Sequence, residues 1–193
     1  MKMYVGITDY DWFNTLKQAN PDEVNFWKPG GRTNFKALDE GDLFLFKLHS
    51  PKYYIVGGGF FLKFSILPSS LAWEAFGIAN GAMSLIELNN RIYKYKKTNR
   101  LSNPDPYIGY IILSVPFYFD EQDWIPVPKD WNRNIVQGKT YDTLDTIGLM
   151  LYEQVQEKLR FQSIIQSGVA SPQNRYGKDQ IIKPRMAKEH SKC

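Results

Sequence analysis

Runs of β-branched and aromatic residues predict a chain built mainly of short strands. The expected strands cover residues 3–7, 43–48, 53–56, 60–64 and 107–119. The short segment 49–52 between two of them indicates a hairpin loop. Gly57, Gly58 and Gly59 also lie between strands, and no Lys-Ser/Thr pair follows them as it would in a phosphate-binding loop. We interpret these glycines as a bulge that lets two backbones approach closely.

Helical periodicity is clearest where Leu85, Leu88, Ile92 and Tyr95 recur at spacings of three and four. Helices are expected over residues 11–16, over 84–97 and from about residue 143 onward. Segment 25–32 is predicted to be a loop because it runs into Pro-Gly-Gly. Strands dominate and helices are inserted between them, so the predicted fold is α+β: a small β-barrel with inserted helices and a C-terminal helix.

The composition is that of a globular protein. The 193 residues are 43% hydrophobic and 23% charged, which excludes a wholly disordered or fibrous chain. Aromatic residues make up 15%, which favours a β-rich core, an aromatic-lined pocket, or both. No apolar run approaches the roughly 20 residues of a membrane span, no signal peptide is evident, and Cys193 is the only cysteine. We therefore expect a cytoplasmic protein with no membrane association and no disulfide.

Charge is concentrated at the C-terminal end. Residues 171–193 carry six cationic and two acidic side chains, which accounts for the whole net charge of +4. We expect residues 1–170 to form one domain and 171–193 to be a basic linker or tail. Because residues 1–170 sum to zero charge, the basic isoelectric point is weak support for a nucleic-acid partner, and a local cationic patch is needed instead.

Motifs for catalysis are missing. The chain has no HxxxH pair, no CxxC and no GxSxG, so we expect no metal site, no cofactor and no activity of this chain alone. The remaining enzyme hypothesis has His49 as acid or base in a small-molecule enzyme, but no partner residue lies at a suitable spacing.

Two polar and aromatic segments predict a binding site for a flat heterocycle. Ring surface, amide groups and cations occur together there, as a pocket for a nucleobase with flanking phosphates requires. The expected base-pocket residues are Asn25, Phe26, Trp27, His49, Gln137 and Tyr141, and the expected phosphate contacts are Lys28, Arg32, Lys47 and Lys139. The alternatives are that Trp27 is a core side chain, that His49 is an ordinary hydrogen-bonding residue, and that the cations of the 84–97 helix form a solvated face.

The stretch 38–49, in which Gly41-Asp42 leads into an apolar strand, and the glycine-containing segment 55–61 that follows it resemble the PUA-like superfamily, which includes the EVE and ASCH branches. More of the chain is similar to the N-terminal domain of bacterial HNH endonucleases. The matching blocks are residues 23–27, 46–49, 55–61, 70–77, 124–128, 134–141, 175–177 and 183–185.

The resemblance implies a domain that reads modified, 5-substituted cytosine in double-stranded DNA by base flipping, for a modification-dependent restriction endonuclease whose HNH domain cuts. No His-Asn-His constellation follows Arg185, so cleavage is not assigned to these residues. The partners implied are modified duplex DNA and a nuclease domain. The second hypothesis is a PUA-like RNA-binding module, because this fold also serves RNA.

Overall fold

The structure, a computed structural model, describes residues 1–28 and 34–169. The described chain runs β1 (Lys2–Thr8), α1 (Tyr10–Ala19), β2 (Glu23–Lys28), β3 (Leu43–Leu48), β4 (Tyr54–Pro68), α2 (Ser69–Phe76), η1 (Gly77–Asn80), α3 (Leu85–Lys96), β5 (Tyr107–Tyr118), η2 (Glu121–Asp123), β6 (Ile125–Pro126), β7 (Gly138–Asp142) and α4 (Thr146–Val169). Strands and helices are mixed along the chain, so the predicted α+β class is confirmed.

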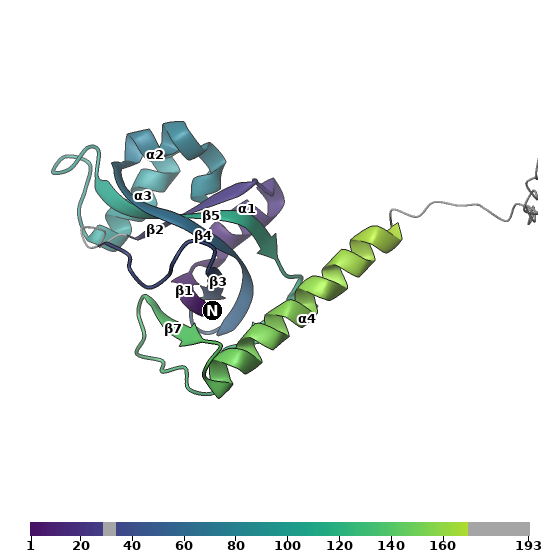
Figure 1. Cartoon of the computed structure of the whole chain (residues 1–193). Helices are drawn as coiled ribbons and strands as arrows, with labels where there is room; N and C mark the ends of the chain where they lie inside the picture. Colours follow the sequence, from purple (N-terminus) through teal and green to yellow (C-terminus); the bar gives the residue numbers. More distant parts are fainter. Residues whose placement is uncertain (29–33, 170–193) are drawn as a thin grey trace, which may run out of the picture.

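The described strands form one mixed sheet of seven, in the order β2-β5-β4-β3-β1-β7, with β6 paired to β4. β1 and β3 run parallel, and the other pairs are antiparallel. The sheet curls strongly, while α2 and α3 lie beside β2 and β5 and the long α4 extends away from the sheet (Figure 1). Side chains from β1 and β2, which lie far apart in the strand order, therefore meet in one core cluster.

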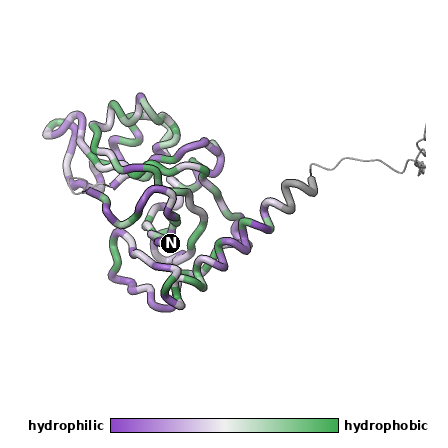
Figure 2. Tube along the Cα trace, viewed as in Figure 1, coloured by the Kyte–Doolittle hydropathy of each residue, from purple (hydrophilic) through white to green (hydrophobic). Residues whose placement is uncertain are grey.

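Among the described residues, three core clusters hold the elements together. In β3 the side chains alternate: Phe44 and Phe46 enter the cluster inside the curl, while Leu43 and Leu45 enter a second cluster on the other face. The third cluster lies between β2, β5 and the helices α2 and α3. Hydrophilic and hydrophobic stretches alternate along α4 (Figure 2). Leu151 and Val155 of this helix are buried in the second cluster.

The three glycines of β4 permit close backbone contact. A Cβ atom at Gly57 would lie 2.3 Å from the Phe117 carbonyl oxygen, and one at Gly58 would lie 2.5 Å from that of Phe44. The pairing of β4 with β5 shifts register between Gly58 and Phe60. The interpretation as a glycine bulge is therefore confirmed.

Two local predictions are wrong. Residues 25–28 belong to β2 instead of a loop, because Val24 and Phe26 are buried by strand alternation. The rest of the expected loop, residues 29–32, lies outside the described residues. The two strands expected over 53–56 and 60–64 are one strand of 15 residues, since the glycines between them remain paired in the sheet. The expected tail, 171–193, lies outside the described residues.

No helix within residues 1–28 and 34–169 combines the length and apolar character needed to cross a membrane.

Candidate functional site

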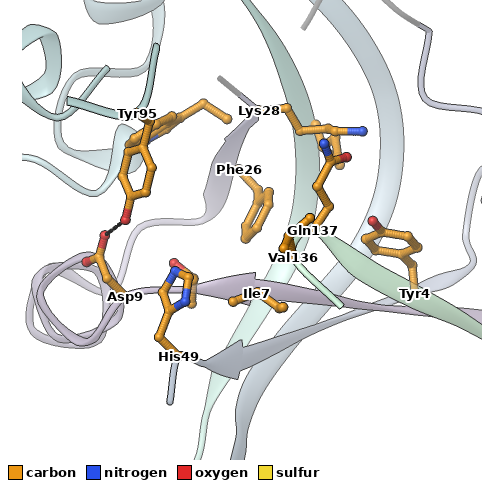
Figure 3. Close-up of a pocket in the computed structure, with 12 residues that line it drawn as sticks. Tyr4, Ile7, Asp9, Phe26, Lys28, His49, Tyr95, Val136 and Gln137 are labelled. Carbon is orange, nitrogen blue, oxygen red and sulfur yellow. Dashed lines mark hydrogen bonds between the residues drawn. The ribbon is translucent and has the colours of Figure 1, made fainter. Parts of the chain in front are cut away.

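A cavity of about 310 Å³ opens where the end of β1 faces the end of β2. Aromatic side chains of β1, β2 and α3 line it, together with Ile7 of β1. Figure 3 shows Asp9, Tyr95 and His49 on one side of the Phe26 ring, and Lys28 and Gln137 on the other. The cavity therefore offers flat apolar surface in the middle and hydrogen-bonding groups at both edges.

The aromatic walls are held by the surrounding structure. Phe26 and Trp27 are 7% and 8% exposed. The Trp27 indole donates a hydrogen bond to the Asn80 carbonyl oxygen at 3.2 Å, and its ring meets Tyr95 edge-on with centroids 5.8 Å apart. Tyr95 is 42% exposed, so a ligand can cover part of its ring. Trp27 is thus both a core side chain and a cavity wall.

Asp9 joins the cavity to the helix behind it. It is the N-cap of α1, where its Oδ1 accepts a hydrogen bond from the Trp12 backbone N–H at 2.7 Å. Its Oδ2 accepts a longer bond, 3.4 Å, from the Tyr95 hydroxyl (Figure 3). Burial, and then the Asp9 carboxylate, raise the pKa of Tyr95 above its usual value. The carboxylate is fixed through one oxygen while the other faces the cavity edge.

The other polar groups come from three different segments. His49 directly follows β3, and burial lowers the pKa of its imidazole, although Asp9 opposes this shift. His49 is therefore mostly neutral at pH 7, with one donor and one acceptor nitrogen. Burial also lowers the pKa of Lys28. Gln137 is held by its backbone, whose carbonyl accepts a hydrogen bond from the Ile7 N–H at 3.0 Å.

The structure brings half of the ten predicted site residues to this cavity: Phe26, Trp27, Lys28, His49 and Gln137. Asn25 lies elsewhere, fully buried, where its amide donates to Asn80 Oδ1 at 2.8 Å. It therefore positions a neighbouring element and does not reach the cavity edge. Arg32 lies outside the described residues.

Three further predicted residues are placed away from the cavity. The Lys139 ammonium pairs with Asp130, and the Tyr141 hydroxyl donates to the same carboxylate at 3.0 Å. Burial, with Asp130, raises the pKa of Tyr141, so this tyrosine is a neutral donor. Lys47 is 2% exposed and enters a neighbouring cavity.

Asp9 and Tyr95 are among the cavity residues that sequence reasoning missed. Asp9 precedes the expected helix over 11–16, where an N-cap is expected, but a cap alone does not indicate a binding role. The sequence pattern predicts Tyr95 only as part of an apolar helical stripe. Within the described residues, no three His, Cys, Asp or Glu side chains are grouped as a metal site requires.

No family model and no curated protein matches the chain. Crystal structures of an ASCH protein from Zymomonas mobilis are similar. Two mutant forms share 6% and 8% identity with TM-scores of 0.48 and 0.47, covering 79% and 80% of this chain and 95% and 99% of theirs. A third, described only as ASCH, shares 10% with a TM-score of 0.46, covering 77% and 93%.

Proposed function

We propose that this protein is a nucleic-acid-binding module that takes a single extruded nucleobase, a 5-substituted cytosine of duplex DNA, into the cavity between β1 and β2. The observation that carries the proposal is the combination of four aromatic side chains, those of Tyr4, Phe26, Trp27 and Tyr95, with polar groups at the edges of a cavity of about 310 Å³. That volume lies near the lower end of ligand pockets, which run from about 300 to 1,000 Å³.

The energetics of base extrusion fit such a cavity. Taking a base out of the duplex costs a few kcal/mol, and stacking on an aromatic side chain contributes about 1–3 kcal/mol per base. Phe26, Trp27 and Tyr95 supply ring surface. Stacking on these rings can therefore offset the loss of stacking in the DNA.

The edge groups fit an amino-substituted heterocycle. A carboxylate accepts a hydrogen bond from the exocyclic amino group of cytosine, and Asp9 Oδ2 is the acceptor at the cavity edge. His49 and Gln137 supply further donors and acceptors. Ile7 provides apolar surface for a substituent at C5.

The narrower parts of the proposal rest on the sequence resemblance. They are the choice of modified cytosine over other bases, the use of duplex DNA, and service to a restriction endonuclease. In this proposal the chain recognises DNA and a separate HNH domain performs the cleavage.

The test is a binding panel at fixed salt with duplexes that differ only at one cytosine: unmodified, 5-methyl or 5-hydroxymethyl. Tyr95→Ala removes one wall, and we expect the preference for the modified duplex to fall by about 5- to 100-fold. Tyr107→Ala is the matched control, because Tyr107 is 61% exposed on β5 and lines no described cavity. It should keep the preference.

Two results would refute the proposal: equal affinity of the parent for all three duplexes, or a folded Tyr95→Ala variant that discriminates as the parent does. A structured RNA competitor is included in the same titration. If RNA displaces the modified duplex at lower concentration than unlabelled duplex does, the ligand is RNA and the DNA proposal fails.

A further inference from the structure

A second cavity, of about 230 Å³, adjoins the first and contains a buried lysine. The two cavities share Ile7, His49 and Val136 in their walls. Lys47 enters the second cavity from β3, although only 2% of the residue is exposed. Lysine is almost never this buried unless it is paired, so its partners are informative.

The position of Lys47 in β3 determines the face of the sheet on which its side chain lies. Alternation along β3 places Lys47 on the same face as Leu43 and Leu45, which belong to the second core cluster. The pairing of β3 with β4 shifts register beside Lys47, yet Lys47 still lies opposite Ile55 of that cluster. A cationic side chain therefore occupies a position where the pattern calls for an apolar one.

The Lys47 ammonium contacts rings instead of carboxylates. Its Nζ lies 4.3 Å from the centroid of Tyr53 and 5.2 Å from that of Trp131, within the range of cation–π attraction. Within residues 1–28 and 34–169, neither a hydrogen bond nor an ion pair involves this Nζ, whereas several other lysines form ion pairs. Burial lowers the pKa of Lys47. Because its Nζ makes no hydrogen bond or ion pair among the described residues, the Lys47 ammonium has N–H donors available for an external acceptor.

The rest of the cavity wall adds positive charge. The Arg133 guanidinium lies 5.5 Å from the Tyr53 ring centroid, and Ser50 and His49 complete the polar wall. Among the described residues that line this cavity there is no Asp or Glu. Both permanent charges at the cavity are therefore positive, which favours an anion.

We propose that the second cavity holds a phosphate group of the same nucleotide whose base occupies the first cavity, with Lys47 and Arg133 as its cationic contacts. This inference rests on the function proposed above. The shared wall of Ile7, His49 and Val136 means that one nucleotide can reach both cavities. Guanidinium and ammonium groups are the usual partners of phosphate oxygens.

The experiment removes one charge from each side of the contact. Duplexes with one 5-methylcytosine carry an uncharged methylphosphonate at either of the two linkages that flank it. The parent should lose about 10-fold in affinity when one particular linkage is neutralised. Lys47→Met keeps the apolar stem without the charge, and we expect it to show little further loss on neutralisation.

A matched control is available in Lys52, whose Nζ also lies over two rings, Tyr10 at 5.0 Å and Trp124 at 5.2 Å, but which lines neither cavity. Lys52→Met should respond to neutralisation as the parent does. Arg133→Gln changes an exposed residue and serves as the second test if Lys47→Met does not fold.

The inference is overturned if Lys47→Met or Arg133→Gln loses as much affinity as the parent on neutralisation, or if neither linkage matters. If the parent then still prefers the modified duplex, only the inference fails and the proposed function stands. Inorganic phosphate gives an independent measurement: it should raise the Tm of the parent and of Lys52→Met, and not that of Lys47→Met. That result without any preference for modified cytosine would uphold the phosphate site and refute the base pocket.

Discussion

Asn80 is the residue through which β2 is joined to the helices that cover it, and its removal gives a quantitative test of the cavity wall. Its Nδ2 donates to the Ala72 carbonyl at 3.0 Å and to the Gly77 carbonyl at 2.8 Å, while its Oδ1 accepts from the Asn25 amide at 2.8 Å. Its own carbonyl holds the Trp27 indole. Asn80→Ala removes the three side-chain bonds and leaves the fourth possible.

The expected loss of stability in Asn80→Ala depends on how far each former hydrogen-bond partner of the Asn80 side chain is buried. The bonds to Asn25 and Ala72 are buried, so each stranded group costs about 1–3 kcal/mol. The Asn25 Oδ1 already has no hydrogen-bond partner, so the variant leaves the whole Asn25 amide unpaired. The Gly77 carbonyl is only partly buried, and water can replace that bond at about 1 kcal/mol or less. Together these contributions are expected to lower the free energy of unfolding by about 2–7 kcal/mol.

Urea unfolding of parent and variants, followed by tryptophan fluorescence and by far-UV circular dichroism, measures this loss. Asn90→Ala is the control, because it deletes the same side chain at an exposed position of α3, and it should stay within about 0.5 kcal/mol of the parent. Adding Asn25→Val to Asn80→Ala removes the stranded amide and should restore part of the stability. A loss below about 1 kcal/mol for Asn80→Ala would show that this network does not hold the wall.

Three further outcomes are expected. Gly57→Ala places a Cβ 2.3 Å from the Phe117 carbonyl and should lower stability by about 1–3 kcal/mol, read as a reduced urea midpoint; an unchanged midpoint contradicts the close approach. Burial raises the pKa of Asp105, but hydrogen bonds from the two serines that begin α2 outweigh it and lower the pKa below 3.8. The resulting stabilisation is present above pH 3.8 and is lost as the pH falls through the pKa of Asp105 in the folded protein. Asp105→Asn should therefore be less stable than the parent by about 1–3 kcal/mol at pH 7. This difference should become smaller in acid. Burial lowers the pKa of His49 below 6.5, so protonation opposes folding, and His49→Gln should lose less stability than the parent when the pH is lowered from 7.5 to 5; equal losses would refute this.

The elements that could be predicted are those whose own residues show a continuous apolar run or a helical stripe of apolar residues. β3 and β5 are continuous apolar and aromatic runs, and α3 shows its stripe of apolar residues, so each was predicted within a residue or two. β2 was mistaken for a loop, since it is a short strand at the end of the sheet and the Pro-Gly-Gly that follows dominates the local composition. The pattern predicts two strands where the structure has the single strand β4, because the glycines in its middle carry no side chain from which strand pairing can be inferred.

The site was predictable where a short segment itself mixes ring, amide and cationic or imidazole side chains, as around Phe26, His49 and Gln137. Phe26, Trp27 and Lys28 are consecutive, and they do line one cavity. Asp9 and Tyr95 are 86 positions apart, and their contact depends on how α3 packs against β2 and the start of α1. A single sequence contains no signal for that packing.

Both cavities lie at the same edge of the sheet, and the topology explains why. β1 and β3 are parallel neighbours, so their carboxyl ends meet there, and Asp9 and His49 are the residues that directly follow them. β7 runs antiparallel to β1 and begins at that edge, which brings Gln137 beside both. The edge residues follow or precede strands whose side chains are fixed in the core, so polar groups can be positioned accurately without being buried in it. Lys47 is the exception, because it is a core position of β3 that carries a charge, and its ammonium lies over the rings of Tyr53 and Trp131.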